Sequence, residues 1–327
     1  MNVKTLTAAL LAALTLATVS EAAASASHES DGQRDLKEFR EAVRLYESGF
    51  LNRSRMLFDD LSQREGGADS KGYSVLCDVS MNVPGYELTM MEFFKAYPYS
   101  IHIPQIRYRH ALNLFDVQDY KGASAEFSQI KARHLDKNQR TEFMFKRAYS
   151  DLENKELDKA LERFHEVEKL PVSDYTAPSR YAIGFINYQK KDFREALAWF
   201  EQAAEDGRFE TISKWYIMEC RFMMHDYSYV VKYGPEMYET LAVERKPHLA
   251  RIISESYLVL GNADAARRYY GLSADGDSPK SRADWFYSGS VLYAVEDYKG
   301  AIECFNNMGM RADSIGQVAN YHLAYSY

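Results

Sequence analysis

Hydrophobic and small residues recur along the chain in a pattern that is about 35 residues long. The clearest copies are 119–127, 192–200 and 297–305, where an Asp precedes an aromatic residue, two polar residues, a small residue and, four residues later, a second aromatic residue. The small residues of all copies stand at positions 54, 89, 123, 160, 196, 230, 266 and 301, which are 34 to 37 residues apart. Such a narrow period over eight copies predicts a repeat architecture.

Each copy also contains an apolar stripe upstream of this motif. In the last complete copy the stripe consists of Trp285, Gly289 and Leu292, whose spacings of four and three residues place them on one face of a helix. The downstream half, 301–308, has the spacing of a second amphipathic helix. Each copy is therefore predicted to be a hairpin of two antiparallel helices, which approach closely at the small residue.

This pattern resembles the tetratricopeptide repeat, a family built from helix hairpins of about 34 residues. The family's Trp, Gly, Tyr, Ala and Phe positions correspond to Trp285, Gly289, Leu292, Ala301 and Phe305. The resemblance covers residues 35–327 and implies an all-α, right-handed superhelical solenoid of about eight hairpins plus a partial ninth. It implies little about function, because this fold serves many unrelated roles.

The copy at 211–246 departs from the pattern. Val230 stands at the small position, Gly234 replaces the aromatic residue, and Pro235 follows directly. Because proline inside a helix removes a hydrogen bond and clashes with the preceding turn, we expect a broken or shortened second helix here. The segment is either a hinge or a copy that has drifted.

The N-terminus has the layout of a secretory signal peptide. Residues 1–26 contain one early positive charge, Lys4, then an uncharged stretch, then small residues that fit an A-x-A cleavage rule. A membrane anchor is the alternative, although the stretch is rich in Ala and Thr and short for a bilayer span. We expect cleavage, a flexible lead-in at 27–34, and export to the periplasm or cell envelope without later membrane insertion.

The C-terminal segment 320–327 matches the first helix of a ninth copy whose second helix is missing. Repeat arrays normally end in a polar capping element. We therefore expect a natural protein that continues past Tyr327.

Composition narrows the class of protein. The chain is 46% hydrophobic and 27% charged, and 40 Lys and Arg against 47 Asp and Glu give a net charge of −7. This mild acidity disfavours a dedicated nucleic-acid binder, which needs clustered basic residues. The three cysteines, Cys77, Cys220 and Cys304, fall in non-adjacent copies. Neighbouring helices lie about 8–10 Å apart, which is too far for a disulfide, so buried free thiols are expected.

Catalytic signatures are missing from the sequence. It contains no GxxxxGK[ST] phosphate loop and no GxGxxG, HExxH or GxSxG motif. The acidic stretch 275–278 lacks the ligand spacing of a calcium loop, and the eight His residues are scattered over different copies. We therefore expect no enzyme activity, no cofactor and no metal site.

The resemblance implies that the first helix of each copy lines a concave groove. Aromatic residues occupy the groove positions and are the candidate partner-binding residues: Tyr108, Phe145, Tyr181, Tyr188, Trp215, Phe222, Phe286 and Tyr293. Aromatic anchors dominate many interfaces, but the same positions also pack neighbouring hairpins together, so packing alone is the alternative interpretation. Scattered polar residues, Glu219, Glu255 and Gln189, are expected to add specificity.

One binding mode of the family is absent. Its chaperone-binding members hold a terminal carboxylate with Lys, Asn and Arg at groove positions, whereas this chain carries residues such as Tyr108 and Leu112 there. The sequence therefore favours a non-enzymatic protein–protein interaction scaffold that binds a protein or peptide segment along the groove. A glycan- or peptidoglycan-binding module is a second hypothesis, because exposed aromatic rings stack on sugars. A third is that the chain is the docking or sensor half of a longer protein.

Overall fold

The computed structural model describes residues 32–64, 66–273, 281–309 and 312–327. Every regular element in these residues is a helix, which confirms the predicted all-α class. The predicted signal peptide and the acidic stretch 275–278 lie outside the described residues. Of the predicted lead-in, residues 32–34 belong to a helix that includes 32–47, and Arg34 Nε lies 3.1 Å from Glu38 Oε1 one turn later.

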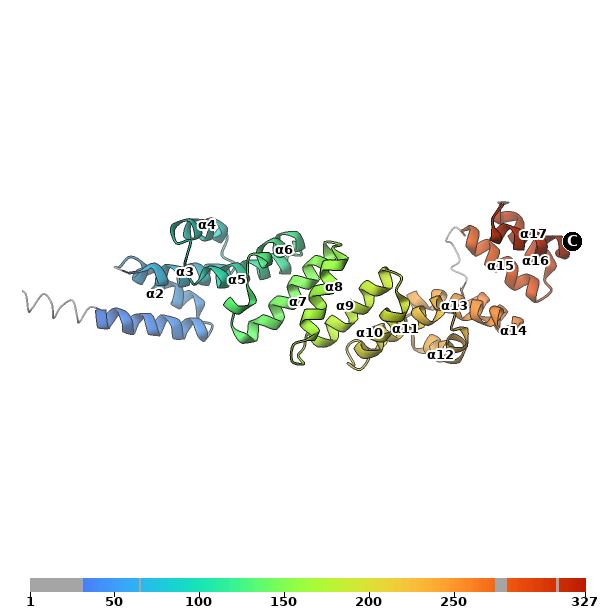
Figure 1. The fold of residues 1–327 in the computed structure, drawn as a ribbon, viewed down its shortest axis with the longest axis horizontal. Helices are drawn as coiled ribbons and strands as arrows, with labels where there is room; N and C mark the ends of the chain where they lie inside the picture. The colour runs from blue at the N-terminus through green and yellow to red at the C-terminus, as the bar shows by residue number, and fades with distance from the viewer. Residues whose placement is uncertain (1–31, 65, 274–280, 310–311) are drawn as a thin grey trace, which may run out of the picture. The chain divides into compact units, whose positions relative to one another are not determined.

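The chain divides into two compact units, Met1–Leu170 and Pro171–Tyr327. The first unit pairs the helix at 32–47 with α2 and continues with three hairpins, as Figure 1 shows: α2 (Leu51–Ser62), α3 (Ala68–Ser80), α4 (Tyr86–Ala96), α5 (Ile103–Asp116), α6 (Tyr120–Ser128), η1 (Ala132–His134), α7 (Lys137–Glu153) and α8 (Leu157–Glu168).

The second unit contains four hairpins followed by a single helix: α9 (Thr176–Gln189), α10 (Phe193–Ala203), α11 (Glu210–Met223), α12 (Tyr227–Thr240), η2 (Val243–Arg245), α13 (Lys246–Val259), α14 (Ala263–Ser273), α15 (Arg282–Ala294), α16 (Tyr298–Met308) and α17 (Ser314–Ser326). The described residues of the two units therefore hold eight hairpins and a ninth first helix, as the repeat period predicts.

The first helix of each hairpin ends with the same backbone geometry in all eight copies. One residue adopts a positive φ, and its position recurs with the repeat: Gly49, Asn82, Gln118, Lys155, Lys191, His225, Gly261 and Glu296. In α9, the Asp192 N–H donates to the Asn187 carbonyl at 2.9 Å, and the Lys191 N–H donates to the Tyr188 carbonyl at 3.0 Å. These two bonds define a Schellman motif, which satisfies carbonyls that the end of the helix would otherwise leave unpaired.

The Asp of the repeat motif serves both helices of the hairpin. After its N–H closes the first helix, the Asp192 carboxylate accepts a hydrogen bond from the Glu195 N–H at 3.2 Å and caps the second helix. Asp119, Asp226 and Asp297 cap α6, α12 and α16 in the same way. This double role explains why an Asp recurs immediately before the second helix.

Close approach of the two helices depends on a small residue facing a large one. A Cβ added to Gly184 would lie 2.9 Å from the Phe200 ring, and a Cβ added to Gly289 would lie 2.5 Å from the Phe305 ring. The predicted small residues are buried in every copy except the second, where Thr89 is only half-buried. In this copy three residues, rather than one, separate the positive-φ Asn82 from the second helix, α4, and Met90 is buried with 5% exposure.

The predicted break in the copy at 211–246 is wrong. Helix α12 runs without interruption for 14 residues and contains Pro235. Gly234 leaves space beside α12, and Ile253 of α13 in the next hairpin occupies it. A Cβ added to Gly234 would lie 2.7 Å from Ile253 Cγ1. Pro235 has no N–H to give to the Val231 carbonyl, and the Tyr257 hydroxyl of α13 donates to that carbonyl at 3.4 Å. Packing against α13 therefore sustains the helix.

The predicted state of the cysteines is confirmed. Cys77, Cys220 and Cys304 are all free and buried. Burial raises the pKa of the Cys77 thiol to about 11 and that of Cys220 to about 12, so both thiols are protonated at neutral pH.

The bond between Tyr257 and Val231 predicts a coupling with Pro235. Replacing Tyr257→Phe should lower the unfolding free energy by about 0.5–1 kcal/mol, because a buried carbonyl loses its donor. In a Pro235→Ala background the restored N–H pairs with Val231, and the same substitution should have less effect. A double-mutant cycle by urea denaturation measures the difference; equal losses in both backgrounds would show that Tyr257 acts only through packing.

Candidate functional site

The predicted groove aromatics lie on first helices, and the structure separates them by exposure. Tyr108 is 1% exposed and Trp215 is 9% exposed, so both belong to the core. The others are half-buried: Phe145, Tyr181, Tyr188, Phe222, Phe286 and Tyr293. Most of the surface of these rings is therefore buried by packing between helices.

Tyr216 of α11 organises part of this packing, and sequence analysis missed it. Its ring stacks on Phe200 with centroids 4.8 Å apart and contacts Tyr188 at 5.2 Å and Tyr181 at 6.0 Å. The residue stands directly after the expected groove position of Trp215. In the sequence, only its position next to Trp215 could have indicated this role. A shift of one residue along a helix decides whether a ring faces the next hairpin or the surface.

A polar cluster, which we call the Glu219 cluster, joins three successive first helices of the second unit. The Glu219 carboxylate of α11 is 7% exposed. It accepts a hydrogen bond from the Tyr188 hydroxyl of α9 at 3.3 Å and pairs with His248 Nε2 of α13 at 2.6 Å. The His248 ring lies 5.4 Å from Trp215, and the Arg245 guanidinium lies 5.3 Å from the Trp215 ring.

Two hydrogen-bond donors compensate the Glu219 carboxylate within the cluster. Burial, followed by the negative charge of Glu219, raises the pKa of Tyr188 above its ordinary value, so the phenol stays a donor. His248 supplies the second donor, and its side chain is 54% exposed. A buried carboxylate with two donors is stable in this position, and the exposed imidazole beside it is the part that a partner can reach.

Glu255 of α13 stands at the same position one repeat later and is in a different state. No hydrogen bond or ion pair joins it to another residue within the described part of the chain. It is half-buried, and burial raises the pKa of its carboxyl above the ordinary value, against the opposing charges of Arg251 and His225. Of the three polar residues expected to add specificity, Glu219 and Glu255 thus lie on neighbouring first helices, while Gln189 is exposed at the end of α9.

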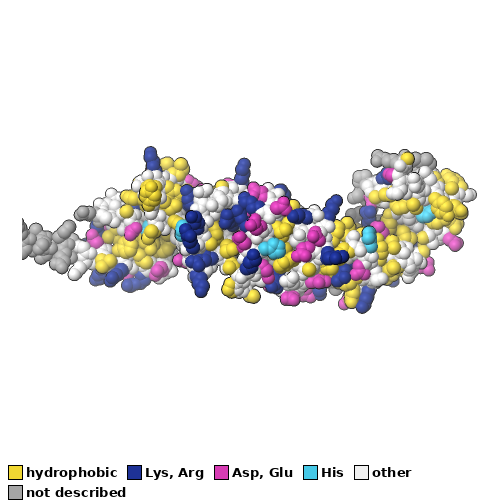
Figure 2. Space-filling view, in the orientation of Figure 1, with side chains coloured by type: hydrophobic (Ala, Val, Ile, Leu, Met, Phe, Trp, Pro, Cys, Tyr) yellow, Lys and Arg dark blue, Asp and Glu magenta, His cyan; other side chains and the backbone are white. Residues whose placement is uncertain are grey.

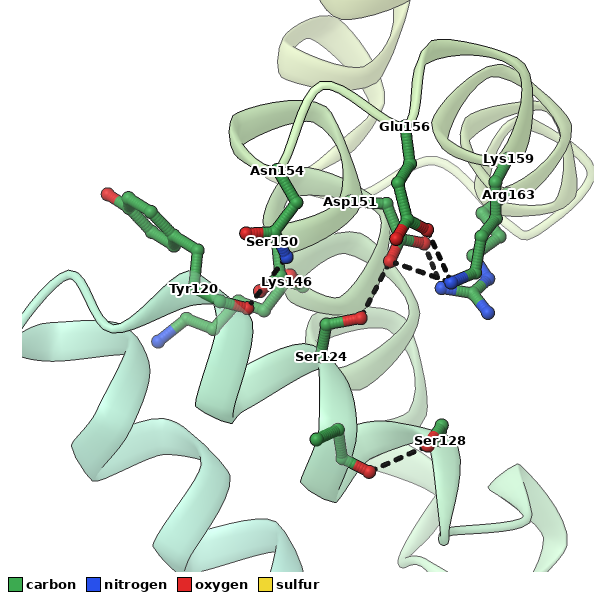
Figure 3. Close-up of polar contacts among 11 residues, drawn as sticks. Tyr120, Ser124, Ser128, Lys146, Ser150, Asp151, Asn154, Glu156, Lys159 and Arg163 are labelled. Carbon is green, nitrogen blue, oxygen red and sulfur yellow. Dashed lines mark hydrogen bonds and ion pairs between the residues drawn. The ribbon is translucent and has the colours of Figure 1, made fainter.

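The first unit contains a buried ionic cluster of a structural kind (Figure 3). Asp151 of α7 is fully buried; it accepts from the Ser124 hydroxyl of α6 at 2.7 Å and pairs with Arg163 of α8. Lys159 Nζ lies 3.5 Å from Asp151 and 2.6 Å from Glu156. The carboxylate thus connects three helices with its charge compensated, and such a cluster specifies packing rather than chemistry.

The described residues contain neither a candidate metal site nor a candidate membrane-spanning helix. No group of three His, Cys, Asp or Glu side chains in ranges 32–64, 66–273, 281–309 and 312–327 could hold a metal ion. Over the same ranges, no helix combines the length and the apolar character that a bilayer span requires. On the face drawn in Figure 2, both acidic and basic side chains occur on each unit.

The fold of this chain is similar to that of several solved structures. The chain is similar to the apo form of RapI, with a TM-score of 0.51 and 10% identity over 89% of this chain and 97% of that one. It is also similar to a tetratricopeptide repeat protein from Parabacteroides merdae, with a TM-score of 0.40 and 10% identity over 90% and 99% of the two chains. No protein-family model and no curated protein sequence matches the chain.

The likeness to RapI, whose TM-score is above 0.5, and the hairpin repeat of the described residues together show a TPR-like fold. At 10% identity the likeness concerns the fold alone. The resemblance stated from the sequence is confirmed for architecture.

The contrast between Glu255 and Glu219 predicts opposite effects on stability. Because the pKa of Glu255 is raised in the folded state, its ionisation favours unfolding; the penalty is small near pH 4 and complete above the folded pKa. Glu255→Gln should therefore raise the melting midpoint at pH 7 by about 1–2 °C and change it little at pH 4.

Glu219→Gln is the matched control. It removes the ion pair with His248 and should lower the midpoint at pH 7 by about 1–2 °C. Calorimetry at both pH values measures the shifts. A fall in the midpoint of the Glu255 variant at pH 7 would mean that this carboxylate has a stabilising partner.

Proposed function

We propose that this TPR-like repeat protein is a non-enzymatic scaffold that binds a protein or peptide segment on the first-helix surface of its second unit. The observation that carries the proposal is the Glu219 cluster, in which α9, α11 and α13 present a continuous set of polar and aromatic side chains. His248 is 54% exposed within it, and Phe222 is half-buried beside it. Aromatic anchors next to oriented polar groups are the usual composition of binding hot spots.

The chemistry of this surface supports binding rather than catalysis. Cys220, which follows Glu219 on α11, is fully buried. Burial raises the pKa of its thiol to about 12, and a protonated thiol is a weak nucleophile. His248 is paired with Glu219, and no hydroxyl nucleophile within hydrogen-bond distance of His248 is found among the described residues.

The alternative of glycan binding loses its main support. Stacking on a sugar needs an open aromatic face, but Trp215 is 9% exposed and lies against His248 and Arg245. A peptide requires less ring surface, because extended chains also use backbone hydrogen bonds and small pockets.

An octapeptide library tests the binding function. An extended octapeptide spans about 26 Å, enough to cross three first helices that lie about 8–10 Å apart. We expect defined, end-blocked octapeptides to bind the protein, and the double variant Phe222→Ala/His248→Ala to bind the best of them at least tenfold more weakly.

Tyr233→Ala, at a 42% exposed position of the second helix α12, is the control and should leave affinity unchanged. Circular dichroism and melting confirm that each variant is folded. The binding function on this surface is overturned if no octapeptide binds, or if both variants bind as the parent does.

We further propose export to the periplasm or cell envelope, which the signal-like segment 1–26 supports. The three buried free cysteines fit such a compartment, because burial shields them from oxidation. Expression of the full chain in a Gram-negative host should yield a soluble envelope product whose intact mass shows loss of about 24–26 residues. An uncleaved product held in the membrane fraction would instead indicate an N-terminal anchor.

A further inference from the structure

The repeat allows each side chain around Glu219 to be compared with its counterpart around Glu255. Relative to the positive-φ residue of its own copy, each glutamate stands six positions earlier, before His225 and Gly261 respectively. The two carboxylates therefore project from equivalent places on α11 and α13. A donor in the preceding copy and a donor in the following copy surround Glu219.

Both donors are missing around Glu255. Tyr188, which donates to Glu219, stands three positions before its positive-φ residue, and Phe222 takes that place in the next copy. His248 stands thirteen positions before its positive-φ residue, and Ala283, which is exposed, takes that place. The repeat thus keeps the carboxylate and removes the hydroxyl and the imidazole that would satisfy it.

The two basic residues whose charges act on Glu255, Arg251 and His225, are bonded to other residues. His225 Nδ1 pairs with the Tyr227 hydroxyl at 2.7 Å. Arg251 lies one turn before Glu255 on α13, and its Nη1 pairs with Asp284 Oδ1 of α15 at 2.6 Å. Asp284 is itself fixed, since its other oxygen accepts from the Ser281 N–H at 2.8 Å in the capping box of α15. The hydrogen bond of Arg251 therefore goes to Asp284, and Arg251 acts on Glu255 through its charge alone.

Aromatic rings complete the surroundings of Glu255. Its charge contributes to the raised pKa of both Tyr227 and Tyr287, so both phenols lie within its field. Phe222 and Tyr227 lie edge to face with centroids 6.0 Å apart. A half-buried carboxylate beside aromatic rings, without a hydrogen-bond donor among the described residues, has the composition of a site for an organic cation.

We propose that Glu255 binds a lysine or arginine side chain of the partner segment, whose N–H groups replace the two missing donors. The proposal rests on the binding function proposed above and names the chemistry that the partner presents. A guanidinium or ammonium brings both the compensating charge and the hydrogen bonds, and Phe222 and Tyr227 contact its apolar stem and its charge. Glu219, which is already satisfied, does not take a cation.

A positional-scanning library of end-blocked octapeptides tests the site. The parent protein should prefer Lys or Arg at one position, and replacing that residue with norleucine should weaken binding about tenfold. Glu255→Gln should abolish the preference and leave affinity for the norleucine peptide unchanged. Glu219→Gln, the matched control, should retain the preference.

A second variant supplies the two missing donors and keeps the Glu255 carboxylate. Phe222→Tyr/Ala283→His rebuilds around Glu255 the two donors that surround Glu219, and it should also lose the preference for Lys or Arg. A preference that persists in Glu255→Gln, or binding without any preference for a cation, would overturn the inference and leave the scaffold function standing. Absence of binding by every octapeptide would overturn both.

Discussion

The turn inside the hairpin is the constraint on which the rest of the structure depends. A residue in the left-handed region ends the first helix and two Schellman bonds close it; in every copy but the second, the second helix begins two residues later. With so few residues between them, the helices have no freedom to choose another angle or register. Every later position in a copy is therefore counted from the turn, and equivalent residues meet equivalent neighbours.

Packing contacts recur at equivalent positions, counted from the turn, even where the amino acids differ between copies. Where the second helix carries Phe200 or Phe305, the first helix carries glycine to receive the ring. In the divergent copy Gly234 receives Ile253 from the following hairpin, and the carbonyl that Pro235 leaves unpaired receives a hydroxyl from Tyr257. The departures are compensated across the boundary between copies, which keeps α12 whole.

This dependence on neighbouring copies explains what the sequence could and could not reveal. The period and the hairpins are local, and the motif around Asp192 or Asp297 predicts them; the double role of Asp is local too, but the sequence analysis did not predict it. The persistence of α12 depends on Tyr257 and Ile253, about twenty residues away, so a rule about proline alone predicted it wrongly. The second copy has two additional residues between its positive-φ residue and its second helix, which an average period conceals, and there Met90 is buried in place of Thr89.

The candidate site was the harder inference for the same reason. Aromatic type at a groove position does not fix exposure, and Tyr108 is buried where Tyr188 is half-buried, because the next hairpin decides how much of each ring it covers. The informative signal is a difference between copies at one position. Glu219 and Glu255 are the same residue on the same scaffold, yet one has two donors and the other has none among the described residues. Because the copies share one backbone, this difference comes from the residues around the two carboxylates, and it is the observation on which the proposed cation site rests.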